Sequence, residues 1–432
     1  MPKKVDCIPL LKALAAAILL TAGRTSGGGV RFDAPLEATP VSAKAPACVD
    51  QYGYEKVISV LPEISGDLVA FLNSRAMHPD SYQIPSSERI AAFEAWVTDV
   101  LDGVDRMRRG ESVDWCAVAG AKATAAGYTL YRFHDSGPGR TGRYFLLGQD
   151  TSTGNQQAPF VINPEARRNI VIEAPHVPND PGSGVGAARV FTSDLAPRAL
   201  ILNGASRCSL PLSVAPAECA GTTAQCTGVQ APFPRSDMAH TIHTLFHSFH
   251  KLLSDRPPPT DRPFALPVRF AQFHTAPAEP VISTGTSDQN QPSAISNTIK
   301  TLLAKRVACR IHSCNDGNDG TPGDSILGVA SNNECADFNP QALYTNTGGS
   351  LDCNSQNPMR GNNRWIQIEG AFDWLSTNTT VDGTAPRPGW FQIMDAMRDP
   401  AAWGLCDLTC EGGYQCSLGP AQLPAARTPC PP

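Results

Sequence analysis

The 432-residue chain has neither an excess of positive charge nor a long apolar run. Its 35 lysines and arginines are outnumbered by 40 aspartates and glutamates, which gives a formal charge of −5. Nucleic-acid binding normally requires a concentrated basic patch, so no nucleic-acid partner is expected. No uninterrupted apolar stretch approaches the roughly 20 residues of a membrane-spanning helix. After removal of an N-terminal signal, no membrane association is therefore expected.

Several common catalytic motifs are also missing. The segment Gly204-Ala-Ser-Arg-Cys208 lacks the second glycine of a Gly-x-Ser-x-Gly elbow, which disfavours a serine hydrolase. There is no Walker loop and no strong dinucleotide-binding fingerprint. The segment His243-Thr-Leu-Phe-His247 lacks the glutamate that follows the first histidine in HExxH metalloproteases. A hydrolytic function would therefore need a different set of residues.

The N-terminal segment resembles an export signal. Residues 1–29 begin with a short basic stretch, continue with an apolar stretch and end in small and polar residues. Residues 30–47 are rich in alanine and proline and are expected to form a flexible linker. A retained membrane anchor is the alternative, which Lys12 disfavours because it interrupts the apolar stretch. We expect a secreted or periplasmic protein.

The sequence is rich in cysteine, with 14 residues. In an exported protein these are expected to form disulfide bonds, because no glutathione pool reduces them. Their spacing suggests local pairs of Cys309 with Cys314 and of Cys335 with Cys353, and a cysteine-rich tail over residues 401–432 that packs on the preceding domain. A structural zinc site is the alternative, but no paired CxxC motif supports it.

The pattern of apolar residues predicts a helical N-terminal region followed by an α/β domain. Helices are expected over 54–73 and 87–107, within a helical region 48–135, and short β-rich runs over 128–133 and 144–148. An α/β catalytic domain is expected over 136–400, since strands alternate there with helices. We predict a three-layer α/β/α sandwich with a mostly parallel sheet. The expected strands are 170–174, 199–202, 268–273 and 365–369, and the expected helices are 184–193, 240–253 and 294–305.

Two histidines follow predicted strands, at the edge where ligand sites form in parallel sheets. His176 follows the strand 170–174, and Asp180 comes four residues later; His274 ends the strand 268–273. Two histidines and one carboxylate would make an open catalytic zinc site that leaves a position for water. The alternative is that each histidine is only a hydrogen-bonded residue at a strand end.

Glu369 ends the apolar segment Trp365-Ile-Gln-Ile-Glu. A carboxylate that leaves a buried strand is expected to have a raised pKa, which suits a general base. The alternative is a salt bridge to Arg364 or to Arg207, which itself follows the strand 199–202.

Four histidines recur at spacings of three, four and three residues: His240, His243, His247 and His250. This spacing predicts one face of a helix that begins at Ser236 or Asp237. Three interpretations stay open. The histidines could serve packing and hydrogen bonding near the site, His240 could contact substrate or support a ligand, or the face could form a separate metal site.

Three motifs occur in the order found in a known superfamily. His176 lies in Ile172-Glu-Ala-Pro-His, His274 in Gln272-Phe-His and Glu369 in Ile366-Gln-Ile-Glu. Over residues 170–375 the chain resembles a divergent member of the N-formylglutamate amidohydrolase and zinc carboxypeptidase superfamily. The resemblance implies a phosphorylase/hydrolase-like fold and one zinc ion, with His176 and His274 as ligands. It also implies Glu369 as general base and Arg207 as a grip for a substrate carboxylate.

The acidic ligand departs from the carboxypeptidase pattern. That pattern places it three residues after the first histidine, where this chain has Asn179, so Asp180 and Glu173 compete for the role. Substrate-binding or supporting roles are expected for His240, Asp237, Arg364 and Glu173. We expect an exported zinc-dependent hydrolase of a small peptide or an N-acyl amino acid. A non-catalytic secreted binding protein on the same fold is the alternative.

Overall fold

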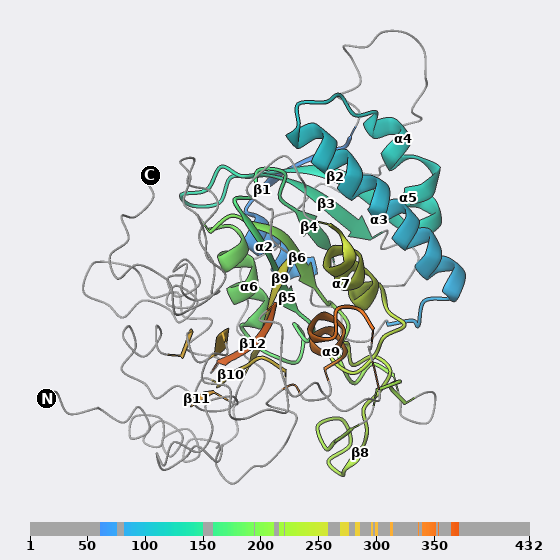
Figure 1. The fold of residues 1–432 in the computed structure, drawn as a ribbon, viewed down its shortest axis with the longest axis vertical. Coiled ribbons are helices and arrows are strands. Elements are labelled where there is room, and N and C mark those ends of the chain that lie inside the picture. Colours follow the sequence, from blue (N-terminus) through green and yellow to red (C-terminus); the bar gives the residue numbers. More distant parts are fainter. Residues whose placement is uncertain are drawn as a thin grey trace, which may run out of the picture.

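A computed structural model describes much of the chain between residues 61 and 370 (Figure 1). The signal and leader 1–29, the linker 30–47 and the tail 401–432 lie outside the described residues. So do Cys309 and Cys314. The described residues are 61–75, 82–149, 159–193, 195–210, 216–219, 221–257, 268–275, 281–285, 295–296, 299–300, 312–313, 336, 339–350, 353 and 364–370.

The centre of the molecule is a ten-stranded sheet with the strand order β1-β2-β3-β4-β6-β5-β9-β12-β10-β11. Five of its nine pairings are parallel, and the four adjacent strands β6, β5, β9 and β12 all run in one direction. The expected mostly parallel α/β fold is confirmed. The strands are β1 (Glu63–Gly66), β2 (Tyr128–Asp135), β3 (Arg143–Gln149), β4 (Phe160–Ile162), β5 (Arg168–Ala174), β6 (Pro197–Leu202), β9 (Arg269–Thr275), β10 (Val281–Ser283), β11 (His312–Ser313) and β12 (Trp365–Gly370); β7 (Thr222–Thr223) and β8 (Ala231–Pro232) form a separate pair.

Helices pack on both faces of the central strands, because successive residues of a strand point to opposite faces. Ile172 and Ala174 of β5 belong to one apolar cluster, together with residues of α2 (Leu68–Arg75) and α6 (Ser183–Phe191). Val171 belongs to the other cluster, together with residues of the helices on the opposite face. Those helices are α3 (Ser87–Arg108), α7 (Leu245–Asp255) and α9 (Pro340–Asn346), with α4 (Trp115–Ala119) and α5 (Ala121–Ala126) beside α3 (Figure 1).

The N-terminal region differs from the expected pattern. The predicted helix 54–73 is confirmed only over residues 68–73, which belong to α2, and is wrong over 63–66, which form strand β1. Asp67 caps this helix by accepting a hydrogen bond from the Ala70 amide at 3.1 Å. Pairing with β2 overrides the helical periodicity before it. Residues 48–135 are therefore not helical alone: they also supply β1 and β2 to the central sheet.

The histidine-rich helix begins later than predicted. Its N-cap is Thr244, whose hydroxyl accepts a hydrogen bond from the His247 amide at 3.0 Å, and not Ser236 or Asp237. His240 and His243 precede the helix, so the four histidines do not share one helical face. The helix expected over 294–305 falls mostly outside the described residues.

Two disulfide bonds join Cys208 to Cys226 and Cys219 to Cys353. The predicted pair of Cys335 with Cys353 is therefore wrong. Cys353 pairs across a sequence separation of 134 residues because the fold brings these segments together. The two bonds indicate an oxidising environment, which agrees with the expected export. Among the helices in the described ranges, none is long and apolar enough to cross a membrane.

Candidate metal centre

Three predicted ligands meet at the carboxyl edge of the sheet. The strand β5 ends at Ala174, and the turn that follows is closed by hydrogen bonds from the amides of Asn179 and Asp180 to the His176 carbonyl, both 2.8 Å. The neighbouring parallel strand β9 brings His274 to the same edge. Asp180 Oδ2 lies 3.5 Å from His176 Nδ1 and 3.2 Å from His274 Nδ1. One ligand atom from each residue lies within 4.8 Å of the others, and all three residues are buried.

The second ring nitrogen of each histidine is occupied by an acceptor. His176 Nε2 lies 2.7 Å from Asp237 Oδ1, and His274 Nε2 lies 2.9 Å from Gln272 Oε1. Carboxylate and amide oxygens only accept hydrogen bonds, so each Nε2 donates, and each Nδ1 faces the Asp180 carboxylate. A metal ion that displaces any proton there would be offered the lone pair of each Nδ1. His176 Nδ1 is buried without a hydrogen-bond partner among the described residues. Two nitrogen donors and one carboxylate oxygen, oriented in this way, fit a metal ion.

Charge favours an ionised acid at this centre. Burial opposes ionisation of Asp180, but Arg207 and the two histidines outweigh it and hold the pKa of the carboxyl far below its usual range. Burial likewise opposes ionisation of Asp237, and His176 outweighs it, so the pKa of Asp237 is also strongly lowered. Burial and Arg207 oppose a charge on His176, but Asp237 and Asp180 raise its pKa; burial lowers that of His274. A bound cation would take the place of the proton on His176.

Arg207 holds the outer oxygen of Asp180. Its Nη2 donates to Asp180 Oδ1, while Oδ2 faces the histidines. Its Nη1 donates to the Gln225 side chain, and its Nε is buried without a hydrogen-bond partner among the described residues. The guanidinium therefore supports the acidic ligand Asp180, and its Nε–H is a further hydrogen-bond donor.

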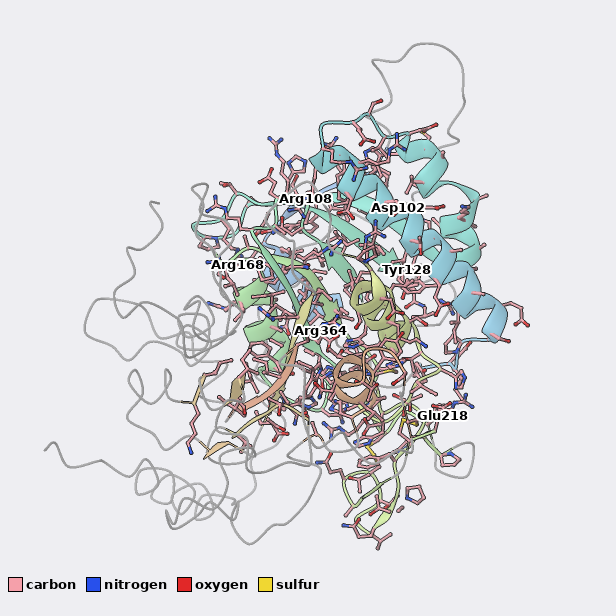
Figure 2. All side chains as sticks on the ribbon, viewed as in Figure 1. Asp102, Arg108, Tyr128, Arg168, Glu218 and Arg364 are labelled. Atoms are coloured by element: carbon pink, nitrogen blue, oxygen red, sulfur yellow. A yellow bond between two sulfur atoms is a disulfide. The ribbon has the colours of Figure 1, made fainter. Side chains whose placement is uncertain are left out.

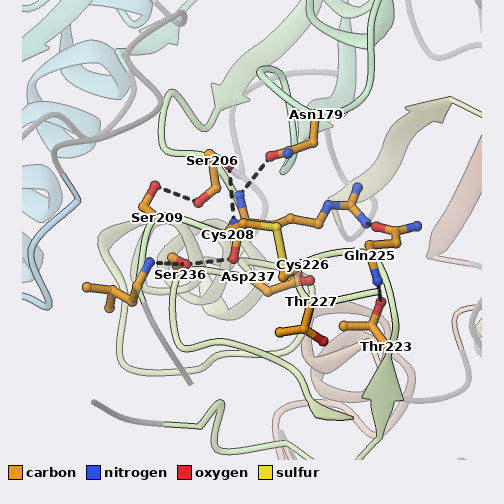
Figure 3. The surroundings of a disulfide bond; sticks show 12 residues. Asn179, Ser206, Cys208, Ser209, Thr223, Gln225, Cys226, Thr227, Ser236 and Asp237 are labelled. Atoms are coloured by element: carbon orange, nitrogen blue, oxygen red, sulfur yellow. Dashed lines mark hydrogen bonds between the residues drawn. A yellow bond between two sulfur atoms is a disulfide. The ribbon is translucent and has the colours of Figure 1, made fainter. Parts of the chain in front are cut away.

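Arg207 directly precedes a disulfide-bonded cysteine, Cys208, whose surroundings are shown in Figure 3. The disulfide between Cys208 and Cys226 joins the residues that directly follow Arg207 and Gln225. Asn179 Oδ1 accepts from the Arg207 amide at 2.7 Å, and Ser236 Oγ donates to the Arg207 carbonyl at 2.7 Å. Asp237, which supports His176, directly follows Ser236. The disulfide thus lies next to Arg207, the support of Asp180, and a hydrogen bond from Ser236 connects Arg207 to the segment that supports His176.

Glu369 lies beside His274 in the sheet. The two residues are register partners on the parallel strands β12 and β9, so their side chains leave the same face, with Cα atoms about 5 Å apart. Glu369 is buried, and its Oε1 accepts a hydrogen bond from Gln367 Nε2. The register therefore places the Glu369 carboxylate on the strand next to the predicted ligand His274.

Arg364 does not reach the centre, contrary to expectation. It precedes β12 and lies at the opposite end of that strand from Glu369 (Figure 2). Its guanidinium donates to the carbonyls of Val268 at 3.0 Å and Ser254 at 2.9 Å. Sites in parallel sheets form at the carboxyl ends of the strands, whereas Arg364 lies at the amino end of β12.

Glu173 is not part of the ligand group. It lies on β5 with its side chain under α7, where it contacts His250 Nδ1 at 2.7 Å and Gln272 Nε2 at 3.1 Å. The group of possible ligands contains Asp180 instead. The competition between the two acidic residues is thereby resolved in favour of Asp180, although it stands one position later than in carboxypeptidases.

His240 lies near the centre as an uncharged ring. It stacks on Phe233 with ring centroids 3.3 Å apart and an interplanar angle of 6°. Burial lowers the pKa of His240 to about 4; Asp237 opposes this shift, while His176 and Arg207 add to it. Its Nδ1 is buried without a hydrogen-bond partner among the described residues. The ring is therefore a neutral polar group with an open nitrogen.

The other three histidines of the run have separate partners. His243 lies 3.1 Å from Glu218, His247 lies 3.2 Å from Gln341 Nε2, and His250 contacts Glu173. Among the described residues, only His176, Asp180 and His274 form a group that could hold a metal. The hypothesis of a separate four-histidine metal site is wrong, because the residues before Thr244 leave the helical path.

Gln272, Asn339 and Gln225 were not predicted to contribute. Gln272 lies two residues before His274 and therefore on the same face of β9. It is a polar residue within an apolar strand, and this pattern could have identified it from the sequence. Asn339 and Gln225 reach the site through contacts distant in sequence, for which no local pattern exists.

Comparison of the chain with protein-family models, with curated proteins and with solved structures finds no match.

Proposed function

We propose that this protein is an exported zinc-dependent hydrolase that cleaves an amide or peptide bond in a small carboxylate-bearing substrate. The observation that supports it most is the convergence of His176 Nδ1, His274 Nδ1 and Asp180 Oδ2 beside the buried Glu369. A set of two histidines and one carboxylate is typical of catalytic zinc sites, which leave a position open, and not of closed structural ones.

The motifs and the fold together support a relation to the N-formylglutamate amidohydrolase and zinc carboxypeptidase superfamily. The motif residues stand at the ends of adjacent parallel strands, as a phosphorylase/hydrolase-like three-layer fold requires. When bound by His176, Asp180 and His274, zinc would polarise the scissile carbonyl and lower the pKa of a coordinated water toward about 7.

The chain's own residues supply the remaining functions. Glu369 would accept a proton from the attacking water and return it to the leaving amine. Arg207 would offer its unpartnered Nε to a substrate oxygen. His240, held neutral against Phe233, would hydrogen-bond a polar group of the substrate.

Metal content and turnover test the proposal together. Purified protein is expected to contain about one zinc per chain by mass spectrometry, and to hydrolyse members of a panel of N-acyl amino acids and dipeptides. Chelation is expected to abolish turnover, and zinc to restore it. Glu369→Gln should keep the zinc but lose activity by a factor of about 100 or more. Equal turnover by metal-free protein, or by Glu369→Gln, would contradict the proposal.

A further inference from the structure

A continuous row of buried polar side chains leads from His274 into the core. His274 Nε2 lies 2.9 Å from Gln272 Oε1, and Gln272 Nε2 lies 3.1 Å from Glu173 Oε2. Glu173 Oε1 lies 2.7 Å from His250 Nδ1, and His250 Nε2 lies 2.8 Å from Thr345 Oγ1. The four residues behind His274 are all 0% exposed. The row thus connects α9 and α7, through β5 and β9, to the metal centre.

The acceptors in this row fix the direction of its hydrogen bonds. The Glu173 carboxylate only accepts, so His250 Nδ1 and Gln272 Nε2 both donate to it. The Gln272 amide is thereby turned with Oε1 toward His274, and Asn339 Nδ2 donates to the same oxygen at 2.6 Å. His274 then donates through Nε2, which leaves Nδ1, 3.2 Å from Asp180 Oδ2, as the nitrogen that would bind a metal.

The stability of the core does not by itself explain why polar residues occupy the positions of Glu173 and Gln272. Val171 and Phe270 occupy the same face of β5 and β9 two residues earlier, and both pack in the apolar cluster under the helices. A buried pair such as Glu173 and His250 often contributes no more to stability than apolar residues of similar volume, because both groups lose their hydration. The polar residues appear where the strands approach the ligand.

We propose that Glu173, His250 and Thr345 are positioning residues for His274, which hold its ring in the tautomer and orientation that bind metal through Nδ1. The inference rests on the proposed metal site. Glu173 acts through the uncharged amide of Gln272, whereas Asp237 contacts His176 directly. Supporting groups of this kind typically affect metal affinity about 10- to 100-fold.

The test measures zinc affinity, the visible spectrum of bound Co²⁺ and the thermal midpoint of the metal-free protein. Glu173→Gln replaces one acceptor oxygen by a donor that faces His250 or Gln272. It is expected to weaken zinc binding about 10- to 100-fold and to shift the Co²⁺ bands. Thr345→Val removes the far end of the row and is expected to cost about fivefold, while Thr345→Ser keeps the hydroxyl and should bind like wild type.

His247→Gln is the matched control. His247 lies one turn before His250 on the same helix and is equally buried, but its partner is Gln341 and not Glu173. It is expected to leave the zinc affinity and the Co²⁺ spectrum unchanged, whatever it does to the thermal midpoint. If Glu173→Gln does not fold, the Thr345 pair decides the question.

The possible failures are distinguishable. Zinc affinities of Glu173→Gln and Thr345→Val within twofold of wild type, with unchanged Co²⁺ bands, would overturn the positioning role and leave the metal site intact. Wild-type protein that binds neither Zn²⁺ nor Co²⁺ would overturn the proposed function itself.

Discussion

The two histidines of the centre are supported in different ways. His176 lies in a turn after β5, and its Nε2 contacts the carboxylate of Asp237. His274 ends a central strand, and its Nε2 contacts the amide of Gln272. The support of His176 is charged and comes from a distant loop segment, Ser236-Asp237, that hydrogen-bonds to the Arg207 carbonyl; that of His274 is neutral and fixed by strand register. The ligand in the turn thus has a charged support from a distant segment, whereas the ligand on the strand has a neutral support from its own strand.

Replacing either histidine ligand should have the largest effect on zinc affinity, and the effect should be similar for His176 and His274. His176→Ala and His274→Ala are each expected to weaken zinc binding by more than about 100-fold, beyond what loss of a supporting residue costs. The measurement is zinc competition against a chromophoric chelator. An affinity near that of wild type in either variant would remove that histidine from the centre.

Replacing Gln272, the support of His274, and Asp237, the support of His176, should have different effects on the pH dependence of zinc binding. Gln272→Leu leaves His274 Nε2 without its acceptor, and Asp237→Asn removes the charge beside His176; each is expected to weaken zinc binding about 10- to 100-fold. Only Asp237→Asn should change the pH dependence of binding. Equal pH profiles of the two variants would show that the charge of Asp237 is not what distinguishes the sides.

The sign of that pH effect follows from the shifted pKa values. Asp237 and Asp180 raise the pKa of His176, so zinc must displace a proton as the pH falls below that pKa, and affinity then decreases about tenfold per pH unit. Asp237→Asn removes one cause of the raised pKa, so the decrease should begin at a lower pH. Titration calorimetry in several buffers, which counts the released protons, provides the measurement.

The disulfide between Cys208 and Cys226 should matter for Asp180, because it lies next to Arg207, the support of that ligand. Cys208→Ser with Cys226→Ser frees the segment that holds Arg207 and Gln225, and is expected to weaken zinc binding about fivefold, the equivalent of one hydrogen bond. Cys219→Ser with Cys353→Ser is the control, since Glu218, the described neighbour of Cys219, pairs with Arg235 and His243. A loss as large in the control would mean that general stability, and not the position of Arg207, is responsible.

Arg364 should show the smallest effect on metal binding. Arg364→Ala leaves the carbonyls of Val268 and Ser254 without this donor and is expected to cost about 1–3 kcal/mol in the free energy of unfolding. Zinc affinity should not change, because Arg364 lies at the far end of β12. Denaturant unfolding and zinc titration check both parts, and a loss of zinc affinity would place Arg364 nearer the centre than we find it.

Sequence patterns predicted the parallel sheet and the histidines that follow its strands. Alternating strands and helices indicated the parallel sheet, and the histidines at the ends of 170–174 and 268–273 lie together because adjacent parallel strands end at one edge. The spacing of the histidines around His240 was misleading, since periodicity does not reveal that the helix is capped by Thr244 and begins only at Leu245.

Contacts between distant segments could not be predicted. His250 meets Glu173 across 77 residues, and Cys219 meets Cys353 across 134. Glu173 was therefore considered as a possible metal ligand, whereas in the structure it contacts Gln272, which in turn contacts the ligand His274. Arg364 looked like a partner of Glu369 because they are close in sequence, but a strand separates its two ends by about 3.3 Å per residue.

Zinc-edge anomalous diffraction from crystals grown with zinc tests the centre most directly. We predict one strong peak, with His176 Nδ1, His274 Nδ1 and Asp180 Oδ2 at about 2.0–2.2 Å and with Glu369 beside it. A peak bound elsewhere, coordination through either Nε2, or no peak at full zinc loading would contradict the proposed metal centre.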